Sequence, residues 1–150
     1  MEKFIGVSAC LIGENCRYDG RNCLNKKVVD FLKNKNLVII CPEILGGIPI
    51  PRVPSEIKGG SGKDVLKGKC KVINREGEDM TEYFIKGAEI TLEILKLNKV
   101  DFVIFKQLSP SCGKGKIYDG SFTNKIIESN GVTTQLLLEN GISIITEEDL

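Results

Sequence analysis

Residues 102–113 read FVIFKQLSPSCG, an apolar run followed directly by a polar segment that ends in Cys112 and a glycine. The same arrangement occurs twice more, because the apolar residues 4–7 lead to Cys10 and the apolar residues 37–40 lead to Cys41. The first run lacks the alternation of a half-exposed strand and therefore suits a sheet that is covered on both faces. Three buried strands that each end in a cysteine are the pattern from which the fold follows.

In an open parallel sheet, ligands bind in the crevice beyond the carboxyl ends of the strands. We therefore expect Cys10, Cys41 and Cys112 to converge, although they are far apart in sequence. The alternative is that they are small buried hydrophobic residues, since free cysteine is among the most buried residue types. Three cysteines at equivalent positions favour the functional interpretation.

The segments between these strands predict the other elements of an α/β domain. Apolar stripes predict helices at about residues 24–33, 79–97 and 133–139, and a last strand at 142–145. In the first helix Leu24, Val28 and Leu32 form the stripe, and Asp79 is expected to cap the second helix.

Two stretches are expected to lie outside the main sheet. Residues 46–62 contain three prolines, which exclude a central strand or a regular helix and favour a pocket wall. Residues 69–78 predict a small hairpin with its turn at or near Glu76-Gly77. The predicted fold is α/β, a three-layer Rossmann-like domain with a mostly parallel sheet and a small hairpin insertion, spanning residues 1–150 as a single domain.

Composition excludes several classes of function. Lys and Arg total 21 against 20 Asp and Glu, so a net charge of +1 gives no indication of a nucleic-acid partner. The absence of histidine excludes an imidazole base and any Cys/His zinc site. The six cysteines include no C-x-x-C pair, and the strong strands and helices argue against a secreted disulfide framework. We expect a reduced, cytoplasmic protein.

Residues 7–10 resemble the cleavage box of a lipoprotein signal peptide. The apolar stretch before Cys10 is too short for a signal peptide and includes Glu2 and Lys3. No apolar run reaches the ~18 residues of a transmembrane helix. No membrane partner is expected.

Three converging cysteines fit a particular metal centre. A structural zinc site needs four protein ligands, and no histidine is present to complete the set. A four-iron four-sulfur cluster that is held by three thiolates would leave one iron open to substrate. Cys16 lies closest in sequence to this site and is a candidate fourth ligand or redox partner, whereas Cys70 is expected to be incidental.

The triplet Tyr-Asp-Gly occurs at residues 18–20 and again at 118–120, each time shortly after one of the cysteines. The two loops are candidates for equivalent walls of one site. The alternative is chance, since Asp-Gly is a common turn.

Several short motifs are spread over the chain: Ser8-Ala9-Cys10, Arg17-Tyr18-Asp19-Gly20, Cys41-Pro42-Glu43 with Leu45-Gly46-Gly47, Pro51-Arg52 with Pro54, Ser109-Pro110-Ser111-Cys112-Gly113, and Ile117-Tyr118-Asp119-Gly120. In combination they resemble a small single-domain bacterial family, formerly of unknown function, whose characterised members are thiouracil desulfidases. The resemblance covers essentially the whole chain.

That resemblance implies a 4Fe-4S cluster ligated by Cys10, Cys41 and Cys112, with the thione sulfur of 2-thiouracil bound at the open iron. It implies a redox-neutral reaction that yields uracil and hydrogen sulfide, with Glu43 and Ser109 as acid/base residues. A small thiolated pyrimidine is the expected partner. The candidates for binding it are Arg17, Tyr18, Asp19, Arg52, Ser111, Tyr118 and Asp119. Taken singly, each of these apart from Ser111 has a role in a turn or a salt bridge as its alternative, and that alternative is favoured.

Other functions share the same cysteines. A dehydratase or a desulfurase of thiolated tRNA bases would use the same cluster, although the chain has no basic stripe for RNA. An iron-sulfur or thiol-based sensor would bind a cluster without releasing sulfide. A metal-free small-molecule binding module would need no iron at all.

Overall fold

Four parallel strands form the main sheet of the computed structural model, which describes residues 3–150. β1 (Phe4–Ser8) lies between β2 (Asn36–Ile40) and β5 (Phe102–Phe105), and β8 (Ser143–Thr146) completes the order β2-β1-β5-β8. The predicted α/β fold with a parallel sheet is confirmed. The three strands that precede cysteines are direct neighbours, so their carboxyl ends lie side by side.

Burial separates the central strands from the edges. Val103, Ile104 and Phe105 of β5 are fully buried, as is Val7 of β1. β2 forms one edge of the sheet, and its Ile39 is 50% exposed. An apolar run is therefore a reliable sign of a strand here, but it does not separate a central strand from an edge strand.

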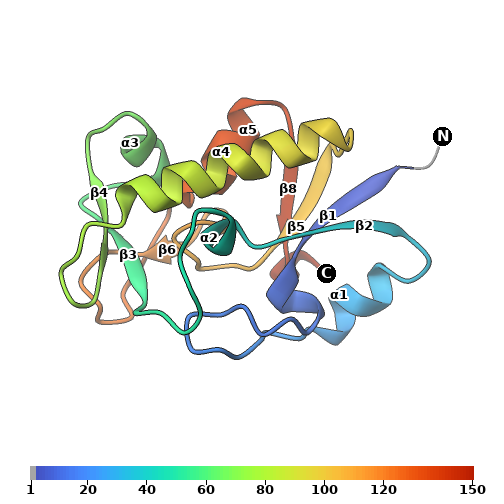
Figure 1. Ribbon diagram of the computed structural model, residues 1–150, viewed down its shortest axis with the longest axis horizontal. Helices are drawn as coiled ribbons and strands as arrows, with labels where there is room; N and C mark the ends of the chain where they lie inside the picture. Colours follow the sequence, from blue (N-terminus) through green and yellow to red (C-terminus); the bar gives the residue numbers. More distant parts are fainter. Residues whose placement is uncertain (1–2) are drawn as a thin grey trace.

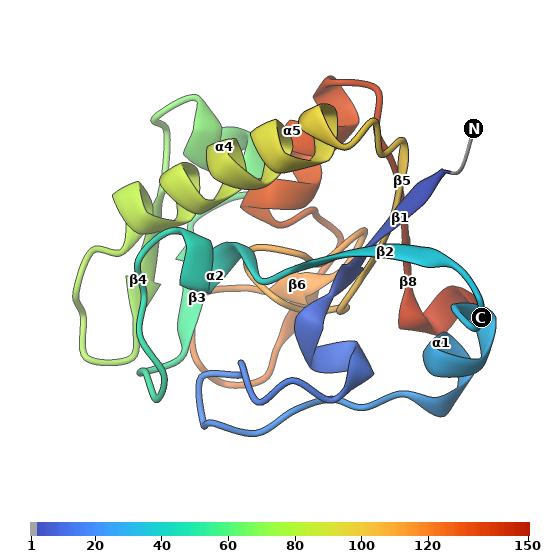
Figure 2. The ribbon, with the colours of Figure 1, turned by 45° about the vertical axis from the view of Figure 1, so that its right-hand side comes forward.

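Helices cover both faces of this sheet (Figures 1 and 2). α4 (Thr81–Leu97) and α5 (Val132–Glu139) pack on one face, where Leu95 and Leu137 join a core with Val103 and Phe105. On the other face lie α1 (Lys26–Phe31) and the short 3-10 helix η1 (Ala9–Ile12), whose side chains pack around Val7 and Ile104. A second 3-10 helix, η2 (Glu147–Asp149), follows β8. Within residues 3–150 we find no helix with both the length and the apolarity needed to cross a bilayer.

A second group of elements, here called the hairpin region, lies beyond the carboxyl ends of β1 and β2 (Figure 1). It consists of β3 (Ser55–Lys58), α3 (Gly62–Leu66), β4 (Lys71–Asn74), β6 (Ile117–Tyr118) and β7 (Ile126–Ile127). β3 pairs with β4, and β6 pairs with β7, both antiparallel. Phe84 and Ala88 of α4 join its core, so one long helix supports both the sheet and the hairpin region.

The hairpin differs from the prediction in one respect. The turn at Glu76-Gly77 is present, with Gly77 at φ 84°, and Met80 returns to donate a hydrogen bond to Val72. The main partner of β4, however, is β3, which begins at Ser55 directly after the last of the three prolines. Residues 46–62 contain no strand of the main sheet, as the prolines predict, but the loop expected there ends in β3, which belongs to a separate hairpin whose edges tolerate neighbouring prolines.

The first helix is shorter than predicted. The Asn25 side chain accepts a hydrogen bond from the Val28 amide, so α1 begins after Leu24, which is left 62% exposed instead of joining the core. The start of α4 also shifts. Met80 is the N-cap, and Asp79 instead accepts a hydrogen bond from the Thr81 amide.

A close backbone contact fixes the short helix α2 (Pro42–Leu45) against α4. A Cβ atom on Gly46 would lie 2.1 Å from the Tyr83 carbonyl oxygen, and one on Gly87 would lie 2.1 Å from the Pro42 carbonyl oxygen. Only glycine permits this approach. α2 carries Glu43 and follows Cys41, so this contact positions both residues.

Candidate functional site

The three predicted cysteines follow the carboxyl ends of adjacent strands and line one cavity of about 280 Å³. Cys10 lies in η1 directly after β1, Cys41 caps α2 after β2, and Cys112 lies in the loop after β5. Cys16 and Cys23 line the same cavity. Cys70 does not, and its thiol contacts the Ser61 carbonyl oxygen at 3.7 Å instead. The site combines sulfur atoms from separate parts of the chain, as the parallel sheet requires.

The thiols in this cavity interact with one another. The Cys16 thiol neighbours those of Cys10 and Cys41, and the Cys10 thiol, together with burial, raises the pKa of Cys16 to about 11. The neighbouring Cys16 thiol, then burial, raises the pKa of Cys41 above its usual range. Burial, then the charges of Cys41 and Glu43, raises the pKa of Cys112. A bound cation close to these thiols would favour their thiolate forms.

The donor set fits an iron-sulfur cluster better than a single ion. Among residues 3–150 no three His, Cys, Asp or Glu side chains are arranged to bind one metal ion. A cluster has different needs, since each thiolate binds its own iron and the ligands do not have to meet at one point. Several soft sulfur donors on one buried wall are the ligand type that such clusters take.

Glu43 lies in the first turn of α2 and is held by Arg52. The Arg52 Nε donates to Glu43 Oε2 at 2.8 Å, and its Nη2 contacts the same oxygen. Nη2 also donates to the Cys16 carbonyl oxygen at 2.9 Å, while the Arg52 amide donates to the Tyr18 carbonyl oxygen at 2.7 Å. Within the described part of the chain, Glu43 Oε1 accepts no hydrogen bond. One carboxylate oxygen is thus anchored, and the other is available to the cavity.

Arg52 was predicted to bind the pyrimidine, but the structure uses its side chain differently. Its side chain is 8% exposed, and its guanidinium bonds Glu43, the Cys16 carbonyl oxygen and, at 3.5 Å, the Pro49 carbonyl oxygen. It lines the cavity as a group that joins α2 to the Cys16 loop.

Ser109 lines the cavity and shapes the turn that presents Cys112. Its Oγ accepts hydrogen bonds from the amides of Ser111 and Cys112, both at 3.1 Å. These bonds use the oxygen as an acceptor and leave the hydroxyl hydrogen free to donate. Ser111 was predicted to bind substrate, but it does not line the cavity. It is 1% exposed, and its hydroxyl pairs with that of Thr133 at 2.7 Å, because the turn directs it toward α5.

The two Tyr-Asp-Gly loops have the same local structure. In each, the aspartate Oδ1 accepts a hydrogen bond from the amide two residues later, and the glycine has a positive φ, 76° at Gly20 and 93° at Gly120. Tyr18 and Tyr118 line the cavity, as does Arg17, whereas Asp19 and Asp119 do not. The aspartates stabilise the turns, and the tyrosines are the members of the repeat that face the site.

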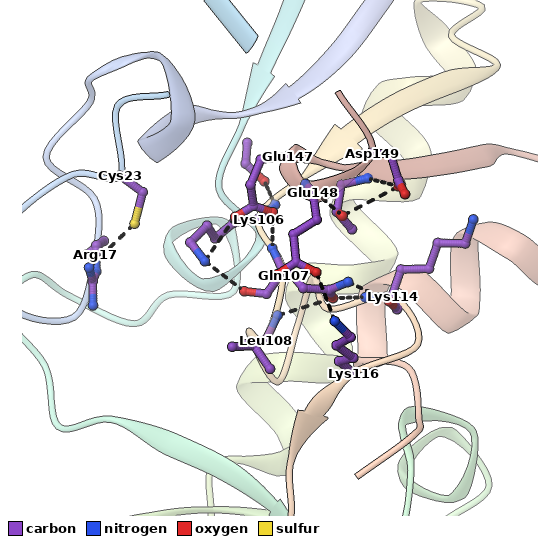
Figure 3. A network of polar contacts seen from close by, with 12 residues as sticks. Arg17, Cys23, Lys106, Gln107, Leu108, Lys114, Lys116, Glu147, Glu148 and Asp149 are labelled. Atoms are coloured by element: carbon purple, nitrogen blue, oxygen red, sulfur yellow. Dashed lines mark hydrogen bonds and ion pairs between the residues drawn. The ribbon is translucent and has the colours of Figure 1, made fainter. Parts of the chain in front are cut away.

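Figure 3 shows how the loop after β5 is fixed. The Lys106 ammonium pairs with Glu147 at 3.0 Å, and the backbone amide of Gln107 donates to the same carboxylate at 2.7 Å. The Gln107 side chain in turn bonds both the amide and the carbonyl oxygen of Lys114. These contacts tie the segment that leads to Cys112 to η2. The Arg17 Nη1 donates a hydrogen bond to the Cys23 sulfur at 3.5 Å, and this contact is drawn in Figure 3.

Sequence reasoning missed several cavity residues. Lys106 lies between the last strand residue and the predicted loop, and Glu56 and Arg75 belong to the β3–β4 hairpin. The sequence contains a weak indication that Lys106 lines the cavity, because Lys106 directly follows the carboxyl end of a predicted strand that leads to the site. Glu56 belongs to the segment 46–62 that was expected to form a pocket wall, but its individual place in the site was not predicted, since the pairing of β3 with β4 is not visible in either segment alone.

The fold and the cavity together define an α/β protein with a buried cluster of thiols beyond the carboxyl edge of its parallel sheet. This chain belongs to the 2-thiouracil desulfurase family, whose model matches residues 5–149. The predicted family is confirmed.

Two similar proteins support this assignment. The chain is 45% identical over 144 residues to the uncharacterized protein YbbK of Bacillus subtilis (strain 168), covering 96% of this chain and 95% of YbbK. Its structure is similar to that of the [4Fe-4S]-dependent thiouracil desulfidase TudS, with a TM-score of 0.86 and 37% sequence identity. That match covers all of this chain and 93% of the TudS chain.

Proposed function

We propose that this protein is a [4Fe-4S]-dependent desulfidase that converts 2-thiouracil, or a related thiolated pyrimidine, to the oxo base and hydrogen sulfide. The observation that carries the proposal is the meeting of Cys10, Cys41 and Cys112 in one cavity, with the free oxygen of Glu43 available beside them. Family membership and the similarity to TudS support the same reaction.

Cys10, Cys41 and Cys112 would hold the cluster, which when bound supplies an open iron as a Lewis acid for the thione sulfur. The net reaction is hydrolysis. Water supplies the oxygen that replaces sulfur on the ring carbon, the sulfur leaves as hydrogen sulfide with the two protons of water, and no electrons are exchanged.

The side chains in the cavity are placed to move those protons. Glu43 Oε1 accepts a proton from the attacking water, while Arg52 keeps Oε2 in position. The Ser109 hydroxyl donates its free hydrogen to the negative charge that develops on the pyrimidine. Tyr18 and Tyr118 line the walls, where aromatic rings suit a flat heterocycle.

The state of the cysteines also supports a cellular location. All six cysteines are free thiols, which is the state that a reducing compartment maintains and that cluster assembly needs. The cytoplasm is therefore the proposed location.

The proposal is tested by anaerobic reconstitution with iron and sulfide, followed by an assay of uracil and sulfide released from 2-thiouracil. Equal amounts of uracil and sulfide, formed only by the reconstituted protein, are the expected result. The protein before reconstitution and a reconstituted Cys112→Ala variant are the controls. A brown protein without turnover would contradict catalysis and favour an iron-sulfur sensor, and a protein that never binds iron would contradict the cluster.

A further inference from the structure

A nearly buried carboxylate lies on the hairpin side of the cavity and has no part in the reaction described above. Glu56 of β3 is 9% exposed and lines the cavity together with Pro54 and Arg75. Alternation along β3 places Glu56 and Pro54 on the same face. The register pairs Glu56 with Ile73, which places Arg75 opposite Pro54 on that face. Glu56 therefore faces the cavity because of strand geometry and not through a flexible loop.

Only one oxygen of this carboxylate is used by the protein. Oε1 accepts hydrogen bonds from the Gly120 amide at 3.0 Å and the Phe122 amide at 3.2 Å. Within residues 3–150, Oε2 accepts no hydrogen bond, and no Lys or Arg nitrogen forms an ion pair with Glu56. The nearby Arg75 guanidinium lies over the Phe122 ring, 5.8 Å from its centre. A carboxylate this buried normally has both oxygens satisfied.

The two oxygens have different tasks. Oε1 holds the second Tyr-Asp-Gly loop against β3, at a point where a Cβ on Gly120 would lie 2.6 Å from the Ile57 carbonyl oxygen. Oε2 keeps some accessible surface, since among the described residues Thr91 Oγ1 is the side-chain oxygen or nitrogen that is both fully buried and without a partner. An ionised carboxylate oxygen only accepts hydrogen bonds, so a ligand that completes it must bring a donor.

We propose that Glu56 determines substrate specificity by accepting a hydrogen bond at Oε2 from a ring N–H of the thiolated base. This inference rests on the proposed desulfidase function. Both ring nitrogens that flank the thione carbon of 2-thiouracil carry a hydrogen, and the product uracil keeps them. The proposal defines the substrate class as thiolated heterocycles that have a free N–H at the position facing β3. Bases with an alkyl group or a lone pair at that nitrogen are rejected, because they leave Glu56 unpaired.

The test compares 2-thiouracil with its two N-methyl isomers, 1-methyl-2-thiouracil and 3-methyl-2-thiouracil, in the reconstituted wild-type enzyme and in Glu56→Gln. The glutamine carbonyl oxygen can still accept from Gly120 and Phe122, while its amide nitrogen replaces the acceptor Oε2 with a donor. Wild type is expected to disfavour one methyl isomer by about 10- to 100-fold in kcat/KM, the range for a hydrogen bond to a charged group. Glu56→Gln is expected to lose this discrimination, mainly through a higher KM for 2-thiouracil.

Two controls separate recognition from folding. Glu89→Gln changes an exposed carboxylate on α4 and is expected to keep wild-type kinetics with all three bases. Glu56→Asp keeps the charge on a shorter side chain and is expected to restore part of the preference for the free N–H. A Glu56→Gln enzyme that is slower by the same factor with all three bases would show a purely structural role and overturn the proposal. Equal wild-type rates with all three bases would overturn it without any variant.

Calorimetric binding of uracil distinguishes this inference from the proposed function. If wild type binds uracil but releases no sulfide, the desulfidase proposal fails, and binding about 10-fold weaker to Glu56→Gln still supports the role of Glu56. If Glu56→Gln binds uracil as tightly as wild type does, the role of Glu56 fails. Absence of uracil binding together with absence of turnover overturns both.

Discussion

The two sides of the cavity are built in different ways. On the sheet side, the cysteines are placed by strands that run in parallel and end at one edge, so their positions follow from local sequence and topology. On the hairpin side, Glu56, Arg75 and Tyr118 are placed by antiparallel pairings and loop contacts between segments far apart in the chain. This difference fits the roles proposed above, in which the sheet side binds the cofactor and the hairpin side recognises the substrate.

The two sides also differ in how tightly their groups are fixed. Cys41 and Glu43 are carried by a helix whose backbone touches α4, and Glu43 is anchored by Arg52. Glu56 instead holds a loop in which Phe122 and Asn124 both have positive φ angles, 59° and 62°. Substitutions on the sheet side should therefore change metal content or the chemical step, and substitutions on the hairpin side should change substrate affinity.

The largest effect is expected from removal of a cluster ligand. Cys10→Ala, Cys41→Ala and Cys112→Ala should each abolish iron binding and turnover, because the remaining thiols no longer hold the cluster on three of its irons. Iron and acid-labile sulfide per chain, measured after anaerobic reconstitution, report the loss directly.

Cys70→Ala is the matched control, since that cysteine lies outside the cavity and should keep full iron content. Cys16→Ala sharpens the comparison. Cys16 lines the cavity but does not follow the end of a strand, so the Cys16→Ala protein should also keep its iron. Loss of iron from Cys16→Ala would make Cys16 a fourth ligand and contradict the assignment of three.

A large effect without loss of iron is expected for Glu43→Gln. The substitution keeps the size of the side chain but removes the base, so kcat should fall by about 10²- to 10⁴-fold, the usual contribution of general acid/base catalysis. Visible absorption of the cluster should be unchanged. An active Glu43→Gln enzyme would remove Glu43 from the reaction.

Arg52→Lys tests whether Arg52 binds substrate or positions Glu43. Lysine keeps the charge but loses the planar group that reaches Glu43 and the Cys16 carbonyl oxygen at the same time, so we expect kcat to fall by about 10-fold, with KM nearly unchanged. Steady-state kinetics at constant iron content separates the two roles. A higher KM at constant kcat would restore the original prediction that Arg52 contacts the pyrimidine.

The sequence was sufficient to predict the sheet side of the cavity, because the patterns that indicate this side are local. The apolar runs before Cys10, Cys41 and Cys112 predict strands directly, and parallel order then brings the cysteines to one edge. The family, the enzyme class and the cofactor were implied by the resemblance of the surrounding motifs to a known family, and the comparisons confirm them. The roles of the individual site residues remain predictions.

The hairpin side was harder to predict from the sequence, because its contacts join residues that no local pattern connects. β3 was missed because it follows three prolines and pairs with β4 across α3. Ser111 and the two aspartates of the repeated triplets belong to the motifs and were predicted to bind substrate, but their side chains are used by turns or by α5. A motif thus indicates that a loop matters, without indicating which of its side chains faces the cavity.

The smallest expected effect belongs to the hairpin side and tests its independence from the metal site. Gly120→Ala places a Cβ 2.6 Å from the Ile57 carbonyl oxygen at a residue with φ 93°, so the loop has to move away from β3. We expect a loss of about 1 to 3 kcal/mol in stability, which corresponds to a melting temperature lower by about 2 to 4 °C per kcal/mol. Because Gly120 donates to Glu56, KM for 2-thiouracil should rise while iron content stays at the wild-type level.

Gly115→Ala is the matched control. Gly115 has a similar φ of 78° but no atom within 4 Å of its Cβ, so this variant separates backbone strain from the clash with β3. Loss of iron from Gly120→Ala alone would show that the two sides of the cavity are coupled, and the division of labour between them would have to be abandoned.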